Sequence, residues 1–165
     1  MKRLLPAVAL VLLLLTGCQL NGKTKVQPLP TDFKAEVEIK TNYGSYKALL
    51  EHSFAYTRLI YSQPEIINGL TLTKTANGCT AEFAGLTVSS DENYFTGLSA
   101  VNLIDEVLKA VIYTDGEALE TTEFDERIII KGMLREIPFE LVRYKDYPKI
   151  ISISIPSCAV EVIFT

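Results

Sequence analysis

The chain has 165 residues, of which 48% are hydrophobic, and its formal net charge is −4 at pH 7. A chain of this length can bury the core of one domain. The acidic balance argues against nucleic acid as a partner and against electrostatic binding to anionic lipid headgroups.

The N-terminus has the pattern of a secretory signal. Lys2 and Arg3 form a short basic region, and the apolar segment Pro6–Leu15 that follows is too short to span a bilayer. The segment runs into Leu-Thr-Gly-Cys at residues 15–18, which resembles the bacterial lipobox. The resemblance implies that a diacylglycerol is attached to the sulfur of Cys18 and that the chain is cut before this residue. The alternative is a plain signal peptide or a membrane anchor with an accidental cysteine.

We therefore predict that residues 1–17 are a lipoprotein signal peptide. Two acyl chains such as palmitate give stable anchoring where one would not, so the protein is expected on the cell membrane, facing away from the cytoplasm. Loss of the two basic residues of the signal changes the net charge to −6. Residues 18–32 are polar and lack periodicity, which predicts a lipidated N-terminus and flexible linker before a single domain at residues 33–165.

Strands are predicted from Phe33 onwards, because the segment to Lys40 alternates apolar and charged residues. Further strands are predicted at residues 46–52, 55–61, 70–76 and 79–84. Asn77-Gly78 between the last two is a strong hairpin signal, because a type I′ turn needs positive φ at both positions. If Ala76 opposes Cys79, the cysteine lies on an apolar face.

One segment, Leu98–Ile112, has its apolar residues at helical spacing instead. The predicted apolar face of this helix consists of Leu98, Val101, Ile104, Val107, Leu108 and Val111. Asp105 and Lys109 are expected to pair on its solvent side.

Four more strands are predicted after the helix, at residues 127–134, 138–144, 150–155 and 159–164. The acidic run from Asp115 to Glu126 is expected to be a solvated loop. About five or six strands, one helix and four strands together predict an α+β domain in which a helix covers a large antiparallel sheet.

The residues that carry chemistry are few. His52 is the one histidine, it ends an apolar strand face, and it is expected to be structural. The sequence has no nucleophile elbow, zinc-protease motif or phosphate-binding loop, and the acidic run lacks calcium-loop spacing. We therefore expect a protein that is not an enzyme and that uses no cofactor and no metal.

Cys79 and Cys158 remain once Cys18 carries lipid. Both are predicted to point into the apolar layer, in a compartment that permits disulfides. We predict a bridge between them, which would add on the order of 4 kcal/mol by closing a long loop. The alternative is that both are buried thiols that behave as small hydrophobic residues.

Three stretches within about Phe33–Leu86 resemble the opening of the LolA/LolB lipoprotein-carrier superfamily: DFKAEVEIKTNYGSYKALL, RLIYSQPEIINGLTL and CTAEFAGL. Members open with alternating strands, a Pro-Glu segment and a glycine-containing strand pair. The resemblance implies an incomplete, curved barrel with a helix across its concave side and a hollow that carriers use for acyl chains. It is nearest to the LolA-like lipoproteins of spore-forming Gram-positive bacteria, one of which acts in germination by binding a cell-wall amidase.

The resemblance implies a non-enzymatic, membrane-anchored binding protein, with two hypotheses for what it binds. The first is a protein-interaction module for a partner of the cell envelope or of sporulation and germination. The second is a binder or carrier of lipid or acyl chains in the hollow. The expected lining of that hollow is Val37, Ile39, Leu50, Leu72, Phe83, Val101, Ile104, Leu108, Val160 and Val162. We favour the protein partner, because the bulky helix is expected to fill much of the hollow.

Overall fold

The computed structural model describes residues 27–90, 99–113 and 119–165. These residues form one antiparallel sheet of eleven strands, one α-helix and two 3-10 turns. Before the helix come β1 (Phe33–Thr41), β2 (Gly44–His52), β3 (Tyr56–Gln63), η1 (Glu65–Ile67), β4 (Thr71–Thr75), β5 (Gly78–Phe83) and β6 (Leu86–Ser90). Then follow α2 (Ala100–Tyr113), β7 (Glu120–Phe124), β8 (Arg127–Leu134), β9 (Ile137–Tyr144), β10 (Ile150–Ile155), η2 (Pro156–Cys158) and β11 (Val160–Phe164).

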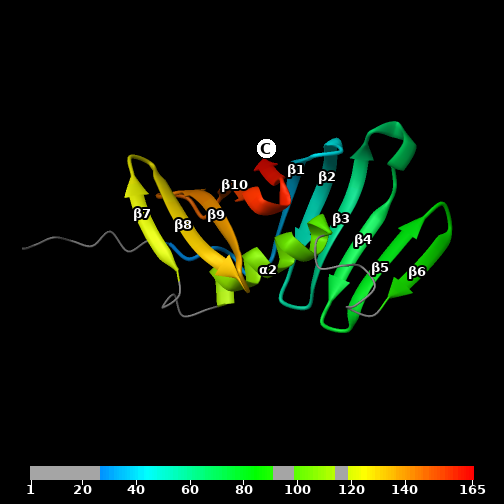
Figure 1. The fold of residues 1–165 in the computed structure, drawn as a ribbon, viewed down its shortest axis with the longest axis horizontal. Coiled ribbons are helices and arrows are strands. Elements are labelled where there is room, and N and C mark those ends of the chain that lie inside the picture. Colours follow the sequence, from blue (N-terminus) through cyan, green and yellow to red (C-terminus); the bar gives the residue numbers. More distant parts are fainter. Residues whose placement is uncertain (1–26, 91–98, 114–118) are drawn as a thin grey trace, which may run out of the picture.

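The strands follow the order β6-β5-β4-β3-β2-β1-β11-β10-β9-β8-β7, so the first and last strands pair in the middle of the sheet. The end strands β6 and β7 do not pair with each other, so the sheet remains open (Figure 1). The predicted α+β fold is confirmed: an incomplete antiparallel barrel with a helix across it.

Helix α2 lies across the sheet and packs against β3, β4 and β8 (Figure 1). The predicted face is confirmed for Val101, Ile104, Val107 and Leu108, which are all buried. The predicted member Leu98 lies outside the described residues.

Burial of the helix extends further around its surface than its apolar spacing predicted. Leu103, Asn102 and Asp105 are buried as well. Lys109 does pair with Asp105, at 2.8 Å, but the prediction that this pair lies on the solvent side is wrong. The Asp105 carboxylate is inside the domain because it also accepts a hydrogen bond from Thr57 on β3.

The β4–β5 hairpin turns one residue earlier than predicted. Thr75 pairs with Gly78, so the two-residue loop is Ala76-Asn77. Lys74, rather than Ala76, therefore opposes Cys79, and this pair is buried on the side that α2 covers. The predicted inward direction of Cys79 holds in spite of the shifted turn.

Two strands were not predicted. β6 follows β5 through a two-residue loop, and β7 lies inside the acidic run that was expected to be a loop. The expectation of a loop is wrong for Glu120–Phe124, which pairs with β8 along its full length. Residues 114–118 of the run lie outside the described residues.

The segment Gln27–Asp32 is docked on the domain, which corrects its prediction as flexible linker. Leu29 is buried in the core. The Arg143 guanidinium donates a 2.6 Å hydrogen bond to the Gln27 carbonyl, and the Tyr113 hydroxyl donates one of 3.1 Å to the Thr31 carbonyl.

Candidate functional site: an apolar pocket beside the docked segment

The residues predicted to line a hollow instead form the packed core. Eight of the ten are buried: Val37, Ile39, Leu50, Val101, Ile104, Leu108, Val160 and Val162. Leu72 is half-buried, and Phe83 is 41% exposed. Helix α2 therefore fills the part of the concave side where the hollow was expected.

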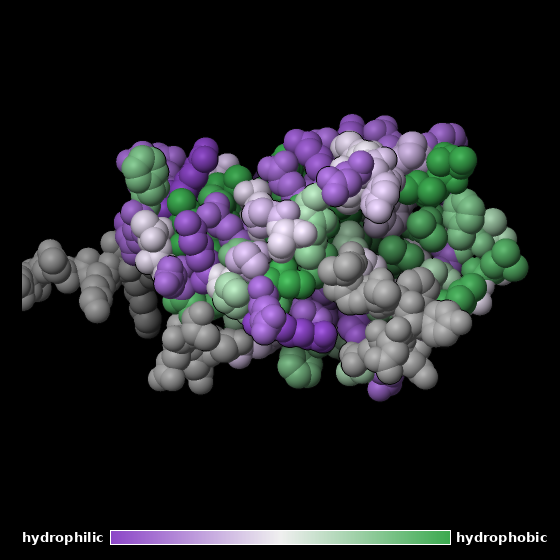
Figure 2. All heavy atoms as spheres, viewed as in Figure 1, coloured by the Kyte–Doolittle hydropathy of each residue, from purple (hydrophilic) through white to green (hydrophobic). Residues whose placement is uncertain are grey.

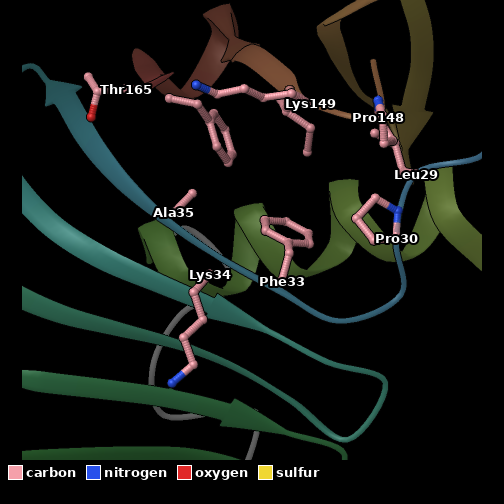
Figure 3. A pocket seen from close by; sticks show the side chains of 10 residues that line it. Leu29, Pro30, Phe33, Lys34, Ala35, Pro148, Lys149 and Thr165 are labelled. Atoms are coloured by element: carbon pink, nitrogen blue, oxygen red, sulfur yellow. The ribbon is translucent and has the colours of Figure 1, made fainter. Parts of the chain in front are cut away.

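A smaller pocket of about 310 Å³ remains where the docked segment meets the middle of the sheet (Figure 3). Its lining is mainly apolar and comes from Leu29 and Pro30, from Phe33 and Ala35 of β1, from Pro148 and Ile150, and from Phe164. Lys34, Lys149 and Thr165 complete it. The Phe33 ring points into the pocket, with α2 behind it (Figure 3).

The two lysines of the pocket differ in their charge environment. Lys34 points away from the pocket (Figure 3), and its ammonium lies 2.6 Å from a Glu51 carboxylate oxygen. This hydrogen bond raises the pKa of Lys34. Lys149 has no ion-pair partner among the described residues, so it is the cation at the pocket rim that is available to an anionic ligand.

A second hollow, of about 530 Å³, lies over β1, β2 and β3. It is larger, but Glu36, Glu38 and Lys47 contribute to its lining together with Ser62 and Asn68. An apolar ligand would displace water from these polar and charged groups, which is unfavourable. The smaller pocket is therefore the better candidate for an apolar ligand.

A buried polar network lies beside the pocket and joins α2 to the sheet. The Thr57 hydroxyl donates to Asp105 Oδ1 at 2.7 Å and lies 2.7 Å from His52 Nδ1. A hydroxyl has one proton, so His52 must donate its Nδ1 proton to Thr57. The His52 ring packs against Phe33 and Tyr113, at centroid distances of 5.6 and 6.2 Å.

Burial of the ring, rather than this network, favours the neutral form of His52. Its side chain is 2% exposed, and Nε2 has no hydrogen-bond partner. Burial lowers the pKa of His52. The nearby carboxylates of Asp105 and Asp32 act against this shift, and the positive charge of Lys109 lowers the pKa further. The prediction of a structural histidine fits this position, because His52 and its partner Thr57 are both buried and the ring supports the pocket residue Phe33.

The predicted disulfide is not formed. Cys79 lies on β5, its sulfur is 2.8 Å from the Asn102 side-chain oxygen, and Cys158 lies in η2 beside β11. Four strands separate β5 from β11, at about 4.8 Å per step. A disulfide needs Cα atoms within about 7 Å, so the fold keeps the two cysteines too far apart.

Within residues 27–90, 99–113 and 119–165, no group of three His, Cys, Asp or Glu side chains is placed to hold a metal ion. No helix in these ranges has the length and apolar character required to cross a membrane.

The sequence signals for the pocket were partial. The alternation of β1 placed Phe33 and Ala35 on the inner face, but it gave no reason to separate them from the core. Leu29 lies between Pro28 and Pro30 in a polar segment that also contains Leu20 and Val26, so the sequence did not single it out as the residue that docks.

No protein-family model and no curated protein matches the chain. Among solved structures, the fold is similar to that of an uncharacterized conserved protein from Thermus thermophilus, with a TM-score of 0.50 and 13% identity over 83% of this chain and 77% of that chain. A LolA superfamily protein from Nitrosomonas europaea aligns with a TM-score of 0.41 and 10% identity over 78% of this chain and 66% of that chain. The first likeness concerns the fold alone.

Proposed function

We propose that this protein is a membrane-anchored lipoprotein outside the cytoplasm that binds one apolar chain of an envelope lipid in the pocket beside Leu29 and Phe33. The observation that carries the proposal is a pocket of about 310 Å³ whose lining is mainly apolar. The resemblance of the opening strands to the LolA/LolB superfamily points to the same class of ligand.

The size of the pocket limits the ligand. Pockets for small ligands have volumes of about 300 to 1,000 Å³, so this one is near the lower limit. Because α2 occupies the rest of the concave side, there is no room among the described residues for a lipid with several acyl chains. We therefore propose a ligand with a single apolar chain, whose anionic headgroup contacts Lys149 at the rim.

Binding of labelled palmitate to the full lipidated chain in detergent micelles tests this function. Ala35→Trp places a large ring in the pocket and is expected to abolish saturable binding. Leu49→Trp, on the opposite face of the sheet, is the matched control and is expected to bind as the wild type does. Lys149→Glu is expected to weaken binding about fivefold, the size of an exposed charge contact. Equal binding by Ala35→Trp and the wild type would contradict the proposal.

A second candidate function is docking of another protein of the cell envelope, including one of sporulation or germination. It is favoured by the filled core and by three exposed apolar side chains at one end of the sheet, which we call the β5–β6 strip: Phe83, Leu86 and Val88. Apolar residues gather at the β5–β6 end of the molecule (Figure 2). Exposed apolar patches on soluble domains often mark interaction sites.

The two functions are separable by one variant. Leu86→Asp is expected to leave palmitate binding unchanged and to prevent photo-crosslinking of the strip to an envelope partner in cells. Loss of palmitate binding in Leu86→Asp would show that the strip and the pocket are not independent.

A further inference from the structure

The two open edges of the sheet differ in charge. The edge strand β6 has the sequence LTVSS and carries no charged residue and no proline. The opposite edge strand β7 has the sequence ETTEF, with Glu120 and Glu123 exposed. Charges on an edge strand prevent it from pairing with another chain, so β7 is protected and β6 is not.

The β5–β6 hairpin determines which backbone groups of β6 face outward. Phe83 pairs with Leu86 across the two-residue loop Ala84-Gly85, whose φ angles of 51° and 82° are those of a type I′ turn. The pair beside such a loop exchanges both backbone hydrogen bonds, and the pattern then alternates along the ladder. The N–H and C=O groups of Thr87 and Ser89 are therefore directed to the open edge.

The side chains of β6 also divide into two sets. Val88 pairs with Ala81, Ala81 with Leu72 and Leu72 with Leu59, so Val88 shares the face of a fully buried core residue. Leu86 and Val88 are nevertheless 73% and 58% exposed, because the core does not extend to this edge. Thr87 and Ser89 face the other side.

We propose that β6 pairs with β6 of a second copy of this chain, antiparallel, with Val88 opposite Val88 of the second copy. The twofold axis (dyad) that relates the two copies then passes through the Val88–Val88 pair. This pair is non-hydrogen-bonded, so its opposing side chains are as close as an antiparallel pair allows. Thr87 pairs with Ser89 of the other copy on each side of the dyad, so the outward backbone groups of both strands are satisfied. The inference goes beyond lipid binding, and it assigns the β5–β6 strip to a second copy in place of the different envelope protein of the second candidate function.

Charge favours β6 over the rest of the surface as the contact between two copies, and the strand is self-complementary in the dyad register. The chain has a net charge of −4, so most contacts between copies bring acidic surfaces together, whereas β6 brings no charge opposite a charge. In the dyad register, Leu86, Val88 and Ser90 of both copies face the same side, so the two β5–β6 strips join. A contact between two strands of five residues buries less surface area than a standard stable interface. The dimer is therefore expected to form only where the local concentration of the chain is high.

Cysteine crosslinking of the full chain in the membranes of cells that produce it tests the pairing. Val88→Cys places two thiols at a pair with Cβ atoms about 4.5 to 5.5 Å apart, so mild oxidation is expected to give a disulfide-linked dimer of the chain. Thr122→Cys is the matched control at the centre of the opposite edge strand and is expected to stay monomeric, as is the wild type. Ser89→Pro removes one outward N–H and is expected to reduce crosslinking of Val88→Cys by at least about fivefold.

Equal crosslinking of Val88→Cys and Thr122→Cys would overturn the proposal, as would capture of a different protein by Val88→Cys in place of the dimer. Palmitate binding separates this result from the pocket function. The Val88→Cys variant is expected to bind palmitate as the wild type does, whether or not it dimerises.

Discussion

His52 shows how a single residue links the helix, the sheet and the pocket. Its Nδ1 proton completes a chain of hydrogen bonds through Thr57 to Asp105, and its ring supports Phe33 at the pocket. The buried Nε2 atom can accept a proton only if it is then left without an acceptor. The folded domain therefore favours neutral His52.

We expect the stability of the domain to fall as the pH is lowered through the range in which His52 titrates. In the unfolded chain His52 takes up a proton near pH 6.5, whereas burial lowers its pKa in the folded state. Protonation therefore favours unfolding below about pH 6.5, and this effect stops below the folded pKa. Urea unfolding at pH 7.5 and pH 5.5 measures the loss.

The control for this experiment is His52→Gln, which has no titrating group. Carboxylates contribute to the pH dependence of both proteins, so the difference between them isolates His52. An equal loss of stability in His52→Gln and the wild type would show that His52 does not cause the pH dependence.

The reactivity of Cys79 and Cys158 tests whether both residues are thiols, as the structure shows. Cys158 is half-buried and Cys79 is buried against Asn102, so an alkylating reagent is expected to modify Cys158 first in the folded protein. Mass spectrometry of unreduced protein after unfolding in the reagent is expected to find both residues alkylated. A peptide that links Cys79 to Cys158 would contradict the structure.

Among the elements, helix α2 could be predicted well from sequence and the outer strands could not. The 3.6-residue spacing of apolar residues located the C-terminus of the helix to within one residue and selected the face that packs on the sheet. β6 and β7 are almost fully exposed, so no burial pattern marked them in the sequence. Their pairing depends on the hairpins that join them to β5 and β8.

The shifted β4–β5 turn could not be predicted from the strand faces. The Asn-Gly signal favours a loop at Asn77-Gly78, whereas the observed loop is Ala76-Asn77 and pairs Leu72 with Ala81. Either loop leaves Leu72 and Ala81 on the side that α2 covers, because the partners shift by two residues and strand side chains alternate with period two. The apolar pattern therefore did not distinguish the two loops.

The helix is expected to supply much of the stability of the domain. Ile104 of α2 is fully buried on the side of the helix that faces the sheet. Ile104→Ala therefore leaves a cavity and is expected to lower the free energy of unfolding by about 2 to 5 kcal/mol. Ile112→Ala removes the same atoms from a half-buried position at the end of the helix, and a smaller loss is expected. Chemical denaturation of both variants measures the difference. Equal losses would mean that α2 does not pack more tightly at Ile104.

For the whole molecule, the pocket could not be located from sequence because it depends on long-range pairing. Phe33 and Phe164 come within 6.5 Å between ring centroids because the first and last strands are neighbours. Alternation placed each residue on an inner face but gave no strand order. The docking of Leu29 and the position of Lys149 at the rim depend on that same order.

In the proposed form, with lipid on Cys18, the docked segment also limits how far the domain can extend from the membrane. Arg143 holds the backbone at Gln27, so the tether from Cys18 has nine residues and reaches at most about 30 Å. The flexible linker predicted for residues 18–32 would have reached about 45 Å. A shorter tether holds the pocket mouth closer to lipids at the membrane surface.

We expect this tether to be the only strong attachment of the domain to the membrane. Cys18→Ala is expected to remove labelled palmitate and to release the protein to the soluble fraction, because each buried methylene of the lost chains contributes about 0.8 kcal/mol. Cys158→Ala is the matched control and is expected to remain labelled and membrane-bound. Metabolic labelling followed by membrane fractionation measures both effects.

Label on Cys18→Ala would show that the lipid is attached elsewhere. An unlabelled Cys18→Ala protein that stays with the membrane would show that the domain has a second membrane contact, and the exposed β5–β6 strip would be the first surface to test.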